Sequence, residues 1–402
     1  HDVTVFERRG AVAEESSFAT GGLVAPGWLP PWAGAGEPAG VLRRLFGRHG
    51  VARISGVPTF AQLRWMTAWS RALRAGAWRA PLAGAQRLAA YSRERMHGLS
   101  HALHLHYECS PGLLVLMPGP KEVDRVRTSL PLLQEAGLRF QELTAGEARA
   151  LEPALSPSQP LAGALHLPDD GVANCREFAL LLRRQAQAQG ARFEFKADVL
   201  PLDRAAPTRL RHQDGDGGVH EEAFDQVVIC AGASAPALLR RTGPRLPILP
   251  VWGYSVTAPI GQELLAPLSA VIDARHQVTI SRLGQRVRVA GGFEFGGRPG
   301  EFHAPTRATL YQVLQDWFPG AARLSGRCTT VQEWKGAHPM VPDGAPVIGA
   351  SGLPGVWLNV GHGPSGWTLA CGSARALADQ VAGRSPEVDL QGLEPTRHRG
   401  AS

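Results

Sequence analysis

Apolar and polar positions alternate along the chain in patterns that predict both strands and helices. Runs of β-branched and other apolar residues indicate buried strands, and apolar residues three or four positions apart indicate helices. The predicted strands cover residues 1–7, 113–117, 192–196, 226–230, 251–257, 278–281, 286–290 and 356–360. The predicted helices cover residues 58–108 with a break near Pro81, 121–136, 177–189, 305–318 and 364–383. A Gly/Asp turn between residues 208–212 and 219–224 predicts a small hairpin.

These elements follow two patterns that are interleaved along the chain. Strands followed by a helix or a glycine turn are typical of a nucleotide-binding α/β domain, whereas the alternating strands between residues 251 and 290 predict an antiparallel sheet. We therefore predict an α/β domain of the Rossmann-like type, interleaved with an α+β domain built on an antiparallel sheet. The first is expected to comprise residues 1–57, 160–250 and 325–402, and the second residues 58–159 and 251–324.

The most informative segment lies near the C-terminus, where the strand 356–360 runs into Gly-His-Gly-Pro-Ser-Gly-Trp-Thr at residues 361–368. The glycines allow a tight turn, and Pro364 suits the first position of a helix. A helix N-terminus offers unpaired N–H groups and a partial positive charge of about half a unit. A reduced flavin carries negative charge at its N1–C2=O edge, so the segment predicts a flavin cradle. The alternative is a strand, a turn and a capped helix without a ligand.

The N-terminal strand points to the same chemistry. It is apolar and ends in Glu7, where the second strand of a dinucleotide-binding βαβ unit places an acid that bonds a ribose hydroxyl. The glycine-rich G-x-G-x-x-G turn normally lies about 20 residues before this acid. Here only six residues precede it. We therefore expect this chain to be an N-terminally truncated fragment whose longer form carries that motif.

Together these ends resemble the FAD-dependent D-amino-acid oxidase superfamily, and most closely its bacterial D-amino-acid dehydrogenase branch. Further segments match this family in order, at residues 16–28, 90–93, 151–155, 253–257, 339–349 and 359–373. The resemblance implies a flavoprotein oxidoreductase of amino-acid catabolism with FAD as its cofactor. In this family, hydride passes from the substrate α-carbon to the flavin, and the imine that forms is hydrolysed to a keto acid and ammonia.

The resemblance also implies which residues contact the cofactor and the substrate. The cofactor-binding set is Glu7, Arg8, Ser17, Gly22, Leu23, Val199, Ala231, Gly232, Gly361, His362, Gly363, Ser365, Gly366, Trp367 and Thr368. The candidate catalytic residues are Tyr254, His338 and His362. Tyr254 either offers its hydroxyl to the ligand or only packs the sheet. His362 is expected chiefly as a turn residue beside the flavin, with proton transfer as the alternative.

The chain departs from the family where the substrate carboxylate is held. His338 replaces an arginine, and Trp252 replaces a basic residue. The segment of residues 16–28 resembles the loop that lies under the flavin in this family, here called the flavin loop, and it has Thr20 for Asn and Leu23 for Gln. An imidazole, with an ordinary pKa of about 6.5, lacks the guanidinium fork. Three functions therefore stay open: oxidation of a D-amino acid or a related amine, oxidation of a non-carboxylate or secondary amine against Trp252 as an aromatic wall, and a degenerate flavin-binding paralogue without turnover.

Composition limits the number of domains and the kinds of partner and location that this chain can have. A chain of 402 residues with 44% hydrophobic content allows two or three domains. Five scattered cysteines without a C-x-x-C pair indicate a reducing compartment and no metal site. The formal charge of +7 comes from dispersed arginines, so no nucleic-acid partner is expected. No apolar run reaches the roughly 18 residues of a membrane span, and we expect a cytoplasmic location.

An arginine- and tryptophan-rich helix around Trp65, Trp69 and Trp78 adds two alternatives. Either it packs under the substrate domain, or it lies on an anionic bilayer as a peripheral contact at the inner face of the bacterial inner membrane. The second arrangement would bring the flavin close to a quinone pool. The expected partners are thus an amine or D-amino-acid substrate and a quinone or other electron acceptor.

Overall fold

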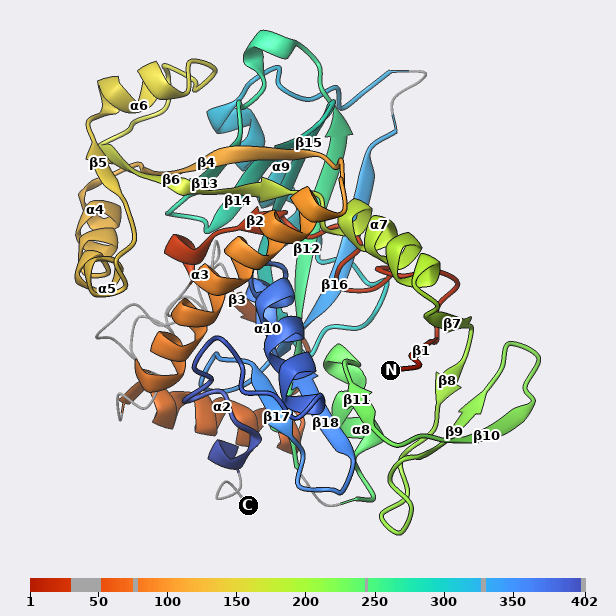
Figure 1. The fold of residues 1–402 in the computed structure, drawn as a ribbon. Helices are drawn as coiled ribbons and strands as arrows, with labels where there is room; N and C mark the ends of the chain where they lie inside the picture. Colours follow the sequence, from red (N-terminus) through yellow and green to blue (C-terminus); the bar gives the residue numbers. More distant parts are fainter. Residues whose placement is uncertain (30–51, 75–78, 243–244, 327–329, 399–402) are drawn as a thin grey trace.

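The computed structural model describes residues 1–29, 52–74, 79–242, 245–326 and 330–398 (Figure 1). Ten strands of this part form one large sheet, with the order β16-β12-β15-β14-β13-β4-β6-β2, and with β3 beside β15 and β5 beside β6. The strands are β2 (Leu23–Val24), β3 (Ala52–Ile54), β4 (Cys109–Met117), β5 (Gln141–Leu143), β6 (Gly163–Ala173), β12 (Leu249–Pro259), β13 (Ala270–Asp273), β14 (Val278–Leu283), β15 (Arg286–Phe295) and β16 (Gln332–Met340). The predicted antiparallel strands between residues 251 and 290 are confirmed.

The two faces of this sheet differ in chemistry because successive side chains of a strand point to opposite sides. Helix α9 (Ala304–Trp317) covers one face, where Val256, Ile280 and Val289 pack against its residues Leu310 and Val313. The alternate positions of β12, β14 and β15 carry small or polar residues, namely Gly253, Ser255, Thr257, Thr279 and Ala290. The loop of residues 20–22 rests on this second face, since a Cβ on Gly21 would lie 3.4 Å from that of Ala290.

Short parallel strands form the nucleotide-binding half. β1 (Thr4–Glu7) pairs in parallel with β7 (Arg192–Phe195), and β11 (Val227–Ile229) pairs in parallel with β18 (Val356–Val360), which also pairs with β17 (Val347–Ala350). Helix α7 (Cys175–Ala188) leads into β7, as parallel connections require. The predicted hairpin is confirmed as β9 (Arg209–Gln213) and β10 (Val219–Ala223), with β8 (Asp198–Val199) at the edge. Helix α8 (Ala235–Leu238) follows β11.

The predicted division into domains crosses the large sheet. By residue number, β6 and β16 belong to the predicted FAD-binding domain, whereas β4 and β12 belong to the predicted substrate domain. The pairs β4–β6 and β12–β16 are hydrogen-bonded. The assignment of residue ranges to two domains stays a prediction.

Prolines mark two helix boundaries, one of which differs from the sequence prediction. The single helix predicted for residues 121–136 is two helices, α4 (Pro120–Arg127) and α5 (Leu130–Glu135). Pro131 explains the break, because a proline inside a continuous helix lacks the N–H that bonds the preceding turn. The break predicted near Pro81 is confirmed, because α2 (Phe60–Arg74) and α3 (Arg79–Ala102) are separate helices, and Pro81 lies in the first turn of α3, where the missing N–H would have no intrahelical partner. α6 (Ala145–Leu151) follows β5.

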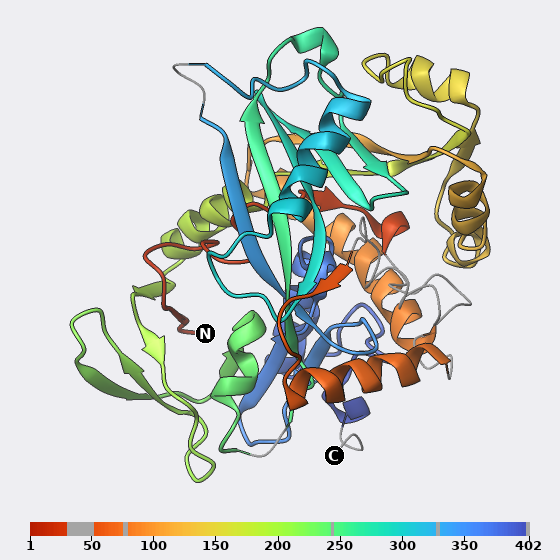
Figure 2. The ribbon, with the colours of Figure 1, turned by 180° about the vertical axis from the view of Figure 1, so that it is seen from behind.

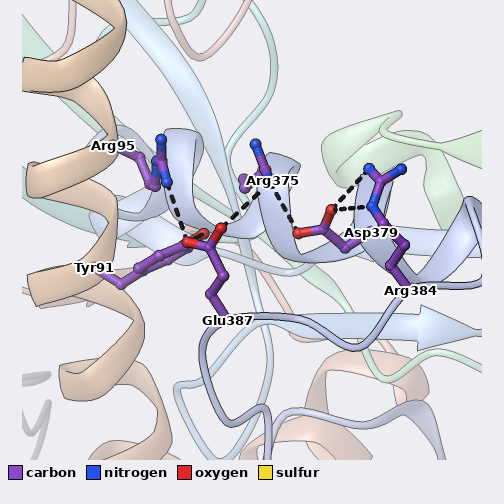
Figure 3. A network of polar contacts seen from close by, with 6 residues as sticks. All are labelled: Tyr91, Arg95, Arg375, Asp379, Arg384 and Glu387. Atoms are coloured by element: carbon purple, nitrogen blue, oxygen red, sulfur yellow. Dashed lines mark hydrogen bonds and ion pairs between the residues drawn. The ribbon is translucent and has the colours of Figure 1, made fainter.

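The C-terminal helix α10 (Gly366–Val381) packs closely on α3, and the two cross at the centre of the molecule (Figures 1 and 2). A Cβ on Gly372 would lie 2.9 Å from the carbonyl oxygen of Leu88, so the contact requires glycine. Figure 3 shows the polar network beside it. Glu387 accepts hydrogen bonds from Tyr91, Arg95 and Arg375, and the buried Asp379 is bound by Arg375 and Arg384. These contacts fix the axis of α10.

Candidate functional site

The turn between β18 and α10 is built on glycines in the left-handed region. Gly361 has φ +76° and Gly363 has φ +56°. A Cβ on Gly361 would lie 2.5 Å from Cγ2 of Val341, so no larger residue fits without movement. Pro364 lies in a short 3-10 turn, Gly363–Ser365, and α10 begins at Gly366 rather than at Pro364. The backbone N–H groups of Ser365 to Thr368 thus lie at the N-terminal end of a 16-residue helix, as the flavin-cradle prediction requires.

Two side chains bind this helix end to the predicted flavin loop. Trp367 Nε1 donates to the carbonyl of Ala173 at 3.0 Å. The hydroxyl of Thr368 donates to the carbonyl of Leu23 at 3.1 Å and accepts from the N–H of Ala25 at 3.2 Å. These side chains are therefore occupied by protein contacts. A cofactor would therefore receive hydrogen bonds from the backbone N–H groups of Trp367 and Thr368, not from their side chains.

The predicted flavin loop is itself ordered by hydrogen bonds. Gly22 has φ +79°, its N–H donates to the hydroxyl of Thr20 at 3.2 Å, and its carbonyl accepts from Ala173 at 2.8 Å. Ser17 hydrogen-bonds the thiol of Cys175, whose pKa is raised by burial to about 12. The loop thus lies between α10 and the polar face of the large sheet.

His338 and His362 are linked through the end of β16. Met340, two positions after His338 on the same face of β16, forms a β-bridge with His362. The Ser373 hydroxyl donates to the Ala370 carbonyl at 3.1 Å, so it accepts from His362 Nε2 at 3.2 Å, and Nδ1 is left as an acceptor. Burial lowers the pKa of each histidine to about 4. Both imidazoles are therefore neutral near neutral pH.

Tyr254 lies on the opposite face of the sheet from His338. It pairs across β12 and β16 with Lys335, whereas His338 pairs with Val251, and these positions alternate in direction. Its ring is buried in the core under α9. Its hydroxyl donates to Glu294 and accepts from the N–H of His303 at 3.3 Å. The structure thus places His338 on the face of β16 that also carries Met340, the bridge partner of His362, and places the Tyr254 hydroxyl on the other face.

A buried cation, Lys335, was missed by the sequence analysis. Its Nζ lies 2.7 Å from Glu294 Oε2 and donates to the Glu301 carbonyl at 2.6 Å. It also lies 5.2 Å from the centre of the Trp252 ring and 5.3 Å from that of Tyr254. The sequence signal for it was rarity, since Lys335 is one of three lysines in the chain.

At the other end of the site, β1 places the predicted ribose-binding acid. One oxygen of Glu7 accepts from the N–H of Arg9 at 2.8 Å. Arg8 forms two hydrogen bonds with Glu15, which together with the charge of Glu15 raise the pKa of the guanidinium. Arg8 is thus committed to an ion pair.

The remaining predicted cofactor residues converge near this strand. Val199 packs with Phe6 against the core that contains Ile229 of β11. Ala231 and Gly232 follow β11, and Gly232 has φ +52°.

Comparisons with known proteins settle the family. The model of the family described as "DAO: FAD dependent oxidoreductase" matches residues 1–380. The chain belongs to this family. A D-amino acid dehydrogenase of Rhizorhabdus wittichii is 37% identical over 402 residues, covering 99% of this chain and 94% of the relative. The D-amino acid dehydrogenase of Agrobacterium fabrum is 35% identical over 401 residues, with the same coverage.

Solved structures show the same fold. A glycine oxidase from Geobacillus kaustophilus has a TM-score of 0.73 at 22% identity, covering 99% of this chain and 92% of that one. An L-proline dehydrogenase from P. horikoshii has a TM-score of 0.65 at 18% identity, covering 78% of this chain and 83% of that one. The predictions of a DAO-family flavoenzyme, of its mixed α/β fold and of FAD as its cofactor are confirmed.

The residues of this DAO-family chain fit the cofactor. The hydroxyl of Ser255 is buried on the polar face of the sheet and has no hydrogen-bond partner within the described residues. An unpartnered buried hydroxyl is costly, and a polar atom of a bound cofactor would satisfy it.

Proposed function

We propose that this chain is a D-amino-acid dehydrogenase, which oxidises the Cα–N bond of a D-amino acid to an imine that hydrolyses to a keto acid and ammonia. The observation that carries this proposal is the 37% identity, over 99% of the chain, to a relative named D-amino acid dehydrogenase. FAD, when bound, supplies the two-electron acceptor.

The protein's own contribution is positioning and electrostatics. The N–H groups at the start of α10 stabilise negative charge beside the glycine turn. The neutral His362 offers an acceptor at Nδ1, because its Nε2 proton is held by Ser373. With a pKa of about 4, its conjugate acid is absent near neutral pH, which supports the role of a turn residue over that of a proton donor.

The second candidate function is oxidation of a secondary amine or of an amine without a free carboxylate. The observation that favours it is the neutral His338, whose ring lies directly on Gly253, with Nε2 2.5 Å from where a Cβ would stand. A neutral imidazole gives a substrate carboxylate no charge-assisted partner. The aromatic wall predicted at Trp252 does not contribute here, because Trp252 shares the face of Tyr254 and Lys335 and lies on the opposite side of β12 from His338.

Steady-state turnover with an artificial dye as electron acceptor separates these candidates. The FAD-loaded protein is assayed with D-alanine, L-alanine, N-methylglycine and simple amines, and the keto acid and ammonia are measured. Faster turnover of D-alanine than of L-alanine supports the first proposal. Turnover of N-methylglycine or amines alone supports the second, and turnover of none indicates the degenerate paralogue.

We propose further that the electron acceptor is a quinone reached at a membrane surface. The start of α2 supports this, since Val57 is 92% exposed, Phe60 82% and Leu63 51%. Trp65 and Trp69 instead pack against Phe295, so the packing alternative holds for these tryptophans, while Trp78 lies outside the described residues. No helix in the described ranges is long and apolar enough to cross a bilayer.

We expect Phe60→Ser to weaken sedimentation of the protein with anionic liposomes, because it removes an apolar side chain from the proposed contact. Leu264→Ser is the matched control, since Leu264 is equally exposed at 90% but lies far from α2 in the sequence. If the unaltered protein does not sediment with the liposomes at low salt, the proposed membrane contact is contradicted.

A further inference from the structure

A cavity of about 250 Å³ lies behind the predicted flavin loop, between the start of α7 and the strands β15 and β16. Three arginines line it, namely Arg176, Arg286 and Arg288, together with Phe18 and Asn174. Figure 1 shows α7 beside the segment that runs from β1 to β2. The glycine turn at residues 361–363 does not line this cavity.

Arg288 is the central cation of this cavity. It is only 4% exposed. Its Nε donates to the Thr257 hydroxyl and its Nη1 to the Thr20 carbonyl, each at 2.9 Å, and both acceptors are neutral. No carboxylate of the described residues lies within 4.0 Å of its guanidinium. Burial and the charge of Arg286 lower its pKa to about 10, so the group stays charged near neutral pH in a field that already favours an anion.

Arg176 is a second cation without an acid partner in the described part of the chain. Its guanidinium lies 4.2 Å from the centre of the Phe18 ring. Its Nε is buried and has no hydrogen-bond partner among the described residues. A buried donor of this kind is normally satisfied, so a ligand that accepts from it is the natural partner.

The acids near the cavity do not cancel these charges. Glu108 pairs with Arg286 and accepts from the side chain of Asn174 at 2.8 Å. Glu177, which also lines the cavity, accepts from the N–H of Glu108 at 2.9 Å. Three arginines and two carboxylates therefore surround the cavity, and the net charge around it is positive.

We propose that this cavity binds a small oxyanion, either a carboxylate or a phosphate, through Arg176 and Arg288. The oxyanion accepts charge-assisted hydrogen bonds from Arg176 Nε and from the N–H groups of Arg288 that Thr257 and Thr20 leave free. Because Arg288 also holds the Thr20 carbonyl, the anion orders the predicted flavin loop from behind. The site is independent of the amine substrate and does not rest on the proposed function.

Isothermal titration of the FAD-saturated protein with inorganic phosphate and with acetate, at constant ionic strength, tests the proposal. We expect saturable binding of at least one of the two, and the stronger one identifies the class of anion. Arg176→Gln is expected to weaken it by about tenfold or more, as the loss of a charged hydrogen bond implies. Arg183→Gln on the same helix is the matched control, because Arg183 lies 4.6 Å from the centre of the Phe195 ring in a comparable stacked contact.

Several outcomes would overturn the proposal. They are no saturable binding of either anion, equal binding by Arg176→Gln and Arg183→Gln, and binding that appears only when FAD is removed. The last would mean that the anion occupies the phosphate site of the cofactor. Arg288→Met is a second variant that should abolish binding, and its circular dichroism spectrum shows whether it folds. Amine turnover plays no part in this readout, so failure here and failure of the proposed function are distinguishable.

Discussion

Replacing Lys335 with methionine is expected to lower the free energy of unfolding by about 3–5 kcal/mol, because the change leaves the buried Glu294 without its cation. The two side chains are 1% and 6% exposed. Burial alone would raise the pKa of Glu294, but hydrogen bonds from Lys335, Ser55 and Tyr254 together lower it. Denaturant unfolding of the two proteins, with equal slopes, measures the difference.

The pH dependence of this loss has a definite sign. In the unaltered protein the lowered pKa of Glu294 means that its stabilisation is present above the ordinary value of 4.5 and is lost as the pH falls. In Lys335→Met, burial dominates and favours the protonated acid, so the deficit should shrink at acid pH. Lys335→Met combined with Glu294→Gln should recover most of the stability. The exposed Lys121 is the matched control, and a loss in Lys335→Met no larger than in Lys121→Met would contradict the account.

His338→Arg is expected to raise kcat/KM for D-alanine by roughly tenfold to hundredfold, since a charged hydrogen bond to the carboxylate contributes about 1.5–3 kcal/mol. Gly253, which carries no side chain, leaves room beside position 338. Because the pKa of His338 is lowered by burial to about 4, the histidine of the unaltered protein carries no charge near neutral pH with which to bind the carboxylate. The gain should therefore be constant from about pH 6 to about pH 9 as far as this histidine is concerned.

Stopped-flow reduction of the bound flavin, with D-alanine varied, measures this effect. His97→Arg adds the same charge at an exposed position of α3 and should leave the specificity constant unchanged. An unchanged or lower value for His338→Arg, in a variant that still holds FAD, would mean that position 338 does not meet a carboxylate. The second candidate substrate class would then be favoured.

The parts of the fold that the sequence predicts are those decided by local chemistry. The strand 356–360 is an apolar run bounded by glycines that tolerate positive φ, and it forms β18 with the expected turn. The helix after it ends at Val381, just before Gly383 with φ +71°, as the pattern predicts. Gly-Asp chemistry likewise produces the hairpin of β9 and β10. No long-range information is needed for these elements.

The parts that escape prediction depend on register and on contacts between distant segments. Lys335 and His338 stand three positions apart on β16, so they face opposite sides, but only the pairing with β12 shows which side holds Tyr254. The pairing of β12 with β15 also has a register shift between Trp252 and Tyr254, which the sequence pattern does not predict. The arginine cavity draws on residues from position 18 to position 332. The lowered pKa of His338 follows from burial, which residue type alone does not give.

The visible absorbance of the FAD-loaded protein, recorded without oxygen while amino acids are added, tests the central claim most directly. The account predicts that a D-amino acid bleaches the oxidised flavin, that one keto acid and one ammonia form for each flavin reduced, and that the L-enantiomer does so far more slowly. Chemical reduction by dithionite serves as the control that the flavin is accessible. A flavin that dithionite bleaches but that no D-amino acid reduces would contradict the account.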